Sequence, residues 1–255
     1  MESMLDLLFD PSKNQRPHRI LLYGVPGIGK STFGAKTPNA VVIPTEDGLR
    51  NISCQAFPLA KDFGQVGKYL EALTGNHNRS TLVIDSLDWL EKLIWKRVAQ
   101  DAGKDGIEDI GYGKGYQYAA DKWNGMLDFI ETELNIKKQM TVVLIAHSQV
   151  IKHQDPATDA YDRYAPRLHK QADAMVREWC DEVLFVNRKV YTTEKDTGFN
   201  RKVTKASGGI ERVMYTTEKP SHLAKNRLDL PDELPFAWSE LAKYLPCLPE
   251  EKKAE

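Results

Sequence analysis

Residues 20–31 decide the fold and read ILLYGVPGIGKS. The segment Gly24–Ser31 matches the pattern G-x-x-x-x-G-K-[ST] and lies between a predicted strand, Ile20–Tyr23, and a predicted helix, Lys30–Lys36. In this context, glycines turn backbone N–H groups inward around phosphates, the lysine bridges the terminal phosphates, and the serine hydroxyl binds magnesium. The sequence therefore predicts a site for ATP and Mg²⁺. The predicted nucleotide-binding residues are Gly24, Val25, Pro26, Gly27, Ile28, Gly29, Lys30, Ser31 and Thr32.

A second apolar run ends in a carboxylate that suits the same metal ion. Asp85 follows Thr81–Ile84 directly, and an aspartate at the end of such a strand holds Mg²⁺ through water. Ser31 and Asp85 are therefore the predicted metal-site residues, and the alternative is that Asp85 only caps the next helix. Ser86 stands where many ATPases carry a glutamate base. The base must then come from elsewhere in the chain.

A glutamate near the end of another apolar run is the candidate for that base. Glu46 follows Val41–Ile43, so it is expected at the edge of the sheet where ligands of open α/β folds bind. There it would polarise the water that attacks the γ-phosphate. The alternative is that Glu46 is only a loop charge and that hydrolysis is weak or absent.

Short apolar runs alternate with longer amphipathic stretches from residue 20 to residue 186, which predicts an α/β fold with a mainly parallel central sheet. The predicted strands are Ile20–Tyr23, Ala40–Ile43, Thr81–Ile84, Thr141–Ala146 and Glu182–Val186. The predicted helices are Lys30–Lys36, Asp88–Ala102, Gln117–Leu134 and Gln171–Trp179. After Val186, polar β segments with turn signals at Asp196–Gly198 and Ser207–Gly209 predict a C-terminal antiparallel extension.

Composition excludes several classes of protein. The 255 residues carry a net charge of -1, so any nucleic-acid surface must be local. Between Asn187 and Arg227, ten basic and four acidic side chains give +6, which suits such a surface or a solvated hairpin face. The three cysteines form no CxxC pair, which argues against a zinc site or a disulfide framework. No run reaches the ~20 apolar residues that cross a bilayer, so we expect no membrane partner and a cytoplasmic location.

The order of these elements, with Glu46 after the second strand and His147–Gln149 after the fourth, resembles the RecA-type P-loop ATPases. It is most similar to short phage recombinases of the Sak type, which anneal single DNA strands. The resemblance implies a RecA-like core at residues 19–231 with a hairpin extension at about 187–220, an N-terminal segment 1–18 and a C-terminal segment 232–255. It also implies that the fourth strand lies between the first and third, and that Gln149 senses the γ-phosphate. A plain surface glutamine is the alternative.

The polar stretch Ile151–Ala172 takes the place of the second DNA-binding loop of that family, and the glycine-rich stretch Gly103–Gln117 takes the place of the first. Interleaved cations and aromatic rings suit a single strand, because cations neutralise phosphates while rings stack on bases. The alternative is a lid with no role in nucleic-acid binding. The candidate DNA-binding residues are Lys152, Tyr161, Arg163, Tyr164, Arg167 and Lys170.

Near the end of the predicted core, His222–Arg227 looks like the strand with which RecA-type subunits reach a neighbour's γ-phosphate. The resemblance implies that Lys225 and Arg227 act in trans, in a homo-oligomeric ring or filament with shared active sites. A solvated basic strand end is the alternative. The candidate catalytic residues are Glu46, Gln149, Lys225 and Arg227.

Together these features predict an ATPase that binds single-stranded DNA and promotes annealing in phage or prophage recombination, inside a bacterial host cell. A single-strand-binding protein is a further expected partner. The alternatives are a nucleotide-switched mediator or loader, which needs a second protein, and a helicase-like motor, which displaces a paired strand.

Overall fold

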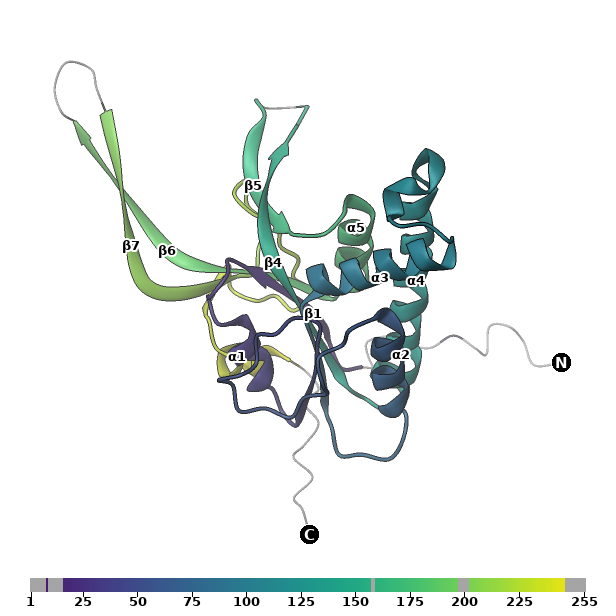
Figure 1. The fold of residues 1–255 in the computed structure, drawn as a ribbon. Coiled ribbons are helices and arrows are strands. Elements are labelled where there is room, and N and C mark those ends of the chain that lie inside the picture. Colours follow the sequence, from purple (N-terminus) through teal and green to yellow (C-terminus); the bar gives the residue numbers. More distant parts are fainter. Residues whose placement is uncertain (1–7, 9–15, 157–158, 197–201, 246–255) are drawn as a thin grey trace, which may run out of the picture.

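The computed structural model describes residues 8, 16–156, 159–196 and 202–245 (Figure 1). Its strands form a sheet in the order β2-β3-β4-β1-β6-β7-β8, with β5 paired to β4 alone. The parallel strands are β1 (Arg19–Gly24), β2 (Ala40–Pro44), β3 (Thr81–Asp85), β4 (Thr141–His153) and β6 (Glu182–Asp196). The antiparallel strands are β5 (Tyr161–Pro166), β7 (Lys202–Tyr215) and β8 (Glu233–Pro235). The predicted α/β fold with an antiparallel extension is confirmed, and β4 lies between β1 and β3.

Both faces of the sheet are covered, which explains why its strands are continuously apolar. Side chains alternate between the faces, so Leu21 and Tyr23 of β1 belong to one buried cluster while Ile20 and Leu22 belong to the other. Helices α2 to α5 pack on the first face, and α1 and α6 pack on the second. The helices are α1 (Lys30–Ala35), α2 (Phe63–Ala72), α3 (Leu87–Asp101), α4 (Lys114–Phe129), α5 (Lys170–Trp179) and α6 (Trp238–Leu241).

One predicted helix differs from the structure by more than a residue at its ends, and one helix was not predicted. The helix expected at Gln117–Leu134 begins earlier, at Lys114, and continues beyond α4 as a π-helical segment, Ile130–Lys137. Helix α2 was not predicted, since Gly64 and Gly67 lower the helix propensity of its sequence. Its start carries a recognisable cap, because the Asp62 side chain accepts a hydrogen bond from the backbone N–H of Gln65 at 2.9 Å.

Two β-hairpins project beyond the carboxyl end of β1 (Figure 1). Gly24 ends β1 opposite His147 of β4 and Val186 of β6, and both of these strands continue past that level. The extension of β4 pairs with β5, and that of β6 pairs with β7. The edge of the sheet that holds the phosphate loop therefore also carries both hairpins.

Three of the predicted loops and turns differ from the structure. The polar stretch Ile151–Ala172 is not one long loop, because it contains the end of β4, all of β5 and the start of α5. The turn predicted at Ser207–Gly209 lies inside β7, where the pairing with β6 shifts in register between Arg188 and Val190, so the glycines accompany an irregular strand. The stretch Gly103–Gln117 contains short 3₁₀ turns and the start of α4.

Other sequence-based predictions concern segments that the structure describes only in part. The turn at Asp196–Gly198 falls mainly outside the described residues, as do most of the N-terminal segment 1–18 and the end of the C-terminal segment. Among the helices of the described ranges, none is both long and apolar enough to cross a membrane.

Candidate nucleotide-binding site

The loop between β1 and α1 has a backbone shape that requires glycine. Gly27 and Gly29 have φ values of 71° and 105°, which strain residues with a side chain. A Cβ atom on Gly24 would lie 2.2 Å from the carbonyl oxygen of Val186, so β6 passes too close for any other residue. The spacing of these glycines in the motif thus follows from the geometry of the loop.

The lysine of the motif lies over this loop, largely buried. Its Nζ atom donates hydrogen bonds to the carbonyl oxygens of Gly24 at 2.9 Å and Val25 at 3.1 Å. Burial lowers the pKa of Lys30, and the nearby carboxylates of Asp85 and Glu46 oppose this shift. The motif therefore places one positive charge where the terminal phosphates of a nucleotide would bind.

Asp85 and Ser31, the two predicted metal-site residues, lie within hydrogen-bond reach of each other. Asp85 ends β3 and is 2% exposed, and its peptide bond to Ser86 is cis. Burial raises the pKa of Asp85, whereas a hydrogen bond from Ser31 and the charge of Lys30 lower it. A hydroxyl and a carboxylate are hard oxygen donors that fit Mg²⁺, which usually takes its other ligands from water and substrate phosphates.

Glu46 lies at the same edge of the sheet, just past the end of β2. Its carboxylate is partly buried, and Oε1 lies 3.9 Å from Nε2 of His147. Burial raises the pKa of Glu46, with His147 opposing the rise and Asp85 and Asp88 adding to it. A carboxylate with a raised pKa is a stronger base than a solvated one. Glu46 thus lies beside the phosphate loop with a raised pKa, and its role as the base stays a prediction.

Three side chains that sequence analysis did not bring together form a cluster next to Glu46. Asp88, which is 4% exposed on its side chain, accepts hydrogen bonds from Nδ1 of His147 at 3.0 Å and from Nη2 of Arg167 at 2.5 Å. It also accepts one from the backbone N–H of His147 at 3.2 Å. Burial alone would raise the pKa of Asp88, but the bonds from His147 and Arg167 hold it well below its usual range.

This cluster fixes the orientation of the histidine ring. Because Nδ1 of His147 faces Asp88, Nε2 is the ring nitrogen that faces Glu46. His147 is also the β4 residue opposite Gly24. The pairs in the cluster lie 59 and 79 residues apart in sequence, so no local motif marks them. The available signal was the position of Asp88 and His147 just after the apolar parts of β3 and β4.

Gln149, the predicted phosphate sensor, has its amide group bound to the neighbouring hairpin strand. Its Nε2 atom donates hydrogen bonds to the carbonyl oxygens of Pro166 at 3.0 Å and Leu168 at 3.3 Å. It lies two positions beyond His147 in β4. The β4 residue that lies level with the phosphate loop is therefore His147 and not Gln149. The predicted role of Gln149 as a phosphate sensor stays untested.

The six candidate DNA-binding residues occupy different environments. Arg163 is mostly buried and pairs with Glu218 at 3.0 Å, and Tyr164 stacks on Phe185 in the core with ring centres 4.9 Å apart. Arg167 belongs to the Asp88 cluster, as described above. The remaining three, Lys152, Tyr161 and Lys170, are exposed or half-exposed along the hairpin and at the start of α5. Tyr161 packs edge-on against His153 across the hairpin.

Lys225 and Arg227 lie at the opposite edge of the sheet, near the amino ends of β1 and β6. The Nζ atom of Lys225 donates hydrogen bonds to carbonyl oxygens of Arg177, Glu178 and Cys180 at the end of α5, at 3.0, 3.0 and 2.6 Å. Arg227 pairs with Asp181 at 3.1 Å and keeps 55% of its side chain exposed. Lys225 is therefore engaged by its own chain as a helix cap, while a role of Arg227 in trans stays a prediction.

Comparison with known proteins agrees with this geometry. The model of the AAA domain family matches residues 16–228, which include the phosphate loop, Glu46, Asp85 and the Asp88 cluster. No curated protein matches the chain. The match covers more than half of the sequence, and the sheet order, the phosphate loop and the carboxylate at the end of β3 are those of a P-loop nucleotide-binding fold. The chain therefore belongs to the AAA domain family of P-loop nucleotide-binding proteins.

Proposed function

We propose that the protein is an ATPase that binds single-stranded DNA and promotes annealing of complementary strands, as part of phage or prophage recombination in a bacterial cell. The observation that carries this proposal is the shared edge of the sheet. The phosphate loop and the base candidate Glu46 lie where both hairpins begin, so a nucleotide and a DNA strand would bind next to each other.

In the proposed hydrolysis step, Glu46 accepts a proton from the water that attacks the γ-phosphate, and Lys30 stabilises the charge on the terminal phosphates. Ser31 and Asp85 would hold Mg²⁺, which neutralises phosphate charge when bound. His147 faces Glu46 at 3.9 Å and is oriented by Asp88, so it is a positioning residue for the base. This division of roles uses only side chains that meet at one edge of the sheet.

The same cluster offers a route from the nucleotide to the hairpin formed by β4 and β5. Arg167 follows β5 directly, and its backbone N–H donates to the carbonyl oxygen of His147 at 2.7 Å. Its side chain bonds to Asp88, and its charge also acts on Lys30. A γ-phosphate would compete with Asp88 for the Arg167 guanidinium, since guanidinium groups bind phosphates as well as carboxylates. We propose that this exchange shifts the base of the hairpin.

The DNA-binding surface of this proposal is smaller than the sequence predicted. It keeps Lys152, Tyr161 and Lys170, since Arg163 pairs with Glu218, Tyr164 stacks on Phe185, and Arg167 bonds to Asp88. A ring or filament of identical subunits, with Arg227 facing a neighbour, would line up several such surfaces along one strand. A single-strand-binding protein is a further proposed partner.

The test is the affinity for a fluorescently labelled single-stranded oligonucleotide, measured by anisotropy with a non-hydrolysable ATP analogue, with ADP and without nucleotide. We expect binding that requires the ATP analogue and falls steeply with salt. Lys152→Ala should weaken it and reduce the slope of log affinity against log salt by about one unit. The matched control, Lys68→Ala on α2, removes an exposed lysine far along the chain from the hairpins and should change neither value. Binding that ignores nucleotide, salt and Lys152 would refute the proposal.

A second candidate function is a nucleotide-switched accessory protein, such as a loader or mediator. The pairing of Arg163 with Glu218 and the stacking of Tyr164 on Phe185 favour it, because these residues are then lost as DNA contacts. Such a protein would show nucleotide-dependent binding to a recombination or replication protein, but only weak DNA binding in the same anisotropy assay. Strand displacement from a duplex would instead indicate a helicase-like motor.

A further inference from the structure

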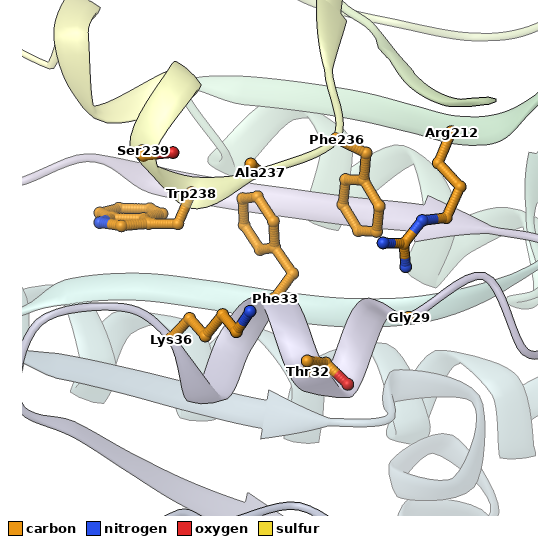
Figure 2. A pocket seen from close by; sticks show the side chains of 9 residues that line it. All are labelled: Gly29, Thr32, Phe33, Lys36, Arg212, Phe236, Ala237, Trp238 and Ser239. Carbon is orange, nitrogen blue, oxygen red and sulfur yellow. The ribbon is translucent and has the colours of Figure 1, made fainter.

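A cavity of about 470 Å³ adjoins the phosphate loop on the outer side of α1 (Figure 2). Its walls come from three parts of the chain: helix α1 with its two caps, strand β7, and the segment that links β8 to α6 together with the start of α6. Gly29 and Thr32 line the end nearest the phosphate loop. The remaining lining residues are Phe33, Lys36, Arg212, Phe236, Ala237, Trp238 and Ser239.

The aromatic wall of this cavity is held in place by the packing behind it. The ring of Phe236 stacks on Phe33 with centres 5.0 Å apart and planes 6° apart. Trp238 meets Phe33 edge-on at 5.8 Å. Phe236 itself is only half-buried, so part of its ring remains accessible. The wall is thus a fixed aromatic surface beside the phosphate loop.

An arginine completes the cavity and connects it to the phosphate loop. The Arg212 guanidinium carbon lies 5.8 Å from the centre of the Phe236 ring, and Nη1 donates a hydrogen bond to the carbonyl oxygen of Ile28 at 3.1 Å. A Cβ atom on Gly29 would lie 2.7 Å from the same Nη1 atom. The glycine of the motif therefore also makes room for Arg212, which belongs to the long hairpin.

We infer that this cavity binds the nucleobase of the nucleoside triphosphate, with a purine ring packed against Phe236 and Arg212. The inference rests on the proposed nucleotide binding and adds the residues that recognise the base. The cavity begins at Gly29 and Thr32, where a nucleotide held by the loop would leave it, and its volume lies within the range of small-molecule sites. Aromatic rings and the planar guanidinium are the groups on which bases stack.

This base site is built partly outside the region matched by the family. The family match ends at residue 228, whereas Phe236 and Trp238 follow it. The C-terminal segment thus supplies part of the aromatic wall of the base site, while Arg212 and the α1 residues come from the matched region. The phosphate loop supplies affinity that does not depend on the base.

The test separates the base from the phosphates by titrating the protein calorimetrically with Mg-ATP, Mg-CTP and magnesium tripolyphosphate. The wild type should bind ATP about tenfold or more tightly than tripolyphosphate, as expected for one stacked base. Phe236→Leu keeps an apolar side chain against Phe33 but removes the ring. It should lose most of that preference and most of the preference for ATP over CTP, while its affinity for tripolyphosphate changes less than about twofold.

The control is Phe57→Leu, which removes one ring from another stacked pair, Phe57 and Tyr69, and should leave all three affinities unchanged. Circular dichroism and thermal unfolding establish that both variants are folded. If Phe236→Leu keeps the full preference for ATP, or loses ATP and tripolyphosphate to the same extent, the base site is wrong. If the wild type binds neither ligand, the proposed nucleotide binding fails as well.

Discussion

Replacing Asp88 by asparagine tests the cluster that links the base candidate to the hairpin. The substitution keeps the size of the side chain but removes its charge, and it turns one of its acceptor oxygens into a donor. Asp88 accepts bonds from the backbone and ring of His147 and from Arg167. Hydrogen bonds to a buried charged group contribute about 1.5–3 kcal/mol each, and the Arg167 pair counts for less because 47% of that side chain is exposed.

We therefore expect Asp88→Asn to lower the free energy of unfolding by about 2–4 kcal/mol at pH 7, measured by urea denaturation. The sign of the pH dependence follows from the lowered pKa of Asp88 in the folded state. A lowered pKa gives stability that is present above the unfolded value, about 4, and is lost as the pH falls below it. The difference between wild type and Asp88→Asn should thus shrink in acid.

The matched control is Asp101→Asn, at the other end of α3, where the exposed carboxylate pairs with Arg97 and Lys122. It should leave the midpoint of denaturation nearly unchanged. An Asp88→Asn variant as stable as the wild type at pH 7, or one whose deficit grows in acid, would refute the account of this cluster.

Three further predictions concern other parts of the molecule. Glu46→Gln should bind ATP but hydrolyse it ~10²-fold more slowly or worse, and phosphate release at the wild-type rate would show that Glu46 is not the base. Burial raises the pKa of Glu91 to about 7, so the folded protein keeps a proton on Glu91 at a pH where the unfolded chain has lost it. The free energy of unfolding of the wild type should therefore decline between pH 5 and pH 8. Glu91→Gln should remove roughly 3 kcal/mol of that decline. If the free energy of unfolding depends on pH in the same way in the variant and the wild type, this prediction is wrong. Lys225→Met should lower the thermal midpoint by several degrees, because three carbonyl groups lose their donor, and should leave ATP hydrolysis by the monomer unchanged. Slower hydrolysis with unchanged stability would instead favour the trans role.

The parts of the site that sequence predicted are those with a local signature. The phosphate loop follows from the spacing of its glycines, and the position of Asp85 follows from a strand that is apolar up to its last residue. Parallel strands end at one edge of the sheet, so the approach of Glu46 to Asp85 also follows from the order of the elements. Each of these inferences depends on neighbours in sequence or on the general geometry of α/β sheets.

The parts that sequence missed depend on contacts between distant segments. The resemblance implies a loop for the segment that forms the hairpin of β4 and β5, and Tyr161–Pro166 shows no alternation of apolar and polar residues that would mark it as a strand. Arg163 and Arg167 look alike in sequence, yet one pairs with Glu218 and the other with Asp88. Lys225 looked like a free cation because the carbonyl groups that bind it lie more than 40 residues away. Charge in a sequence shows that a side chain needs a partner, but it does not show which partner is near.

The most direct test of the central claim, that Gly24–Ser31 binds the phosphates of ATP, is a calorimetric titration of the wild type and Lys30→Ala with Mg-ATP. The Lys30 amine is the positive charge held over the loop by Gly24 and Val25, so its loss should abolish measurable binding while far-ultraviolet circular dichroism stays the same. Lys68→Ala serves again as the control and should bind like the wild type. A folded Lys30→Ala protein that binds Mg-ATP with wild-type affinity would contradict the claim.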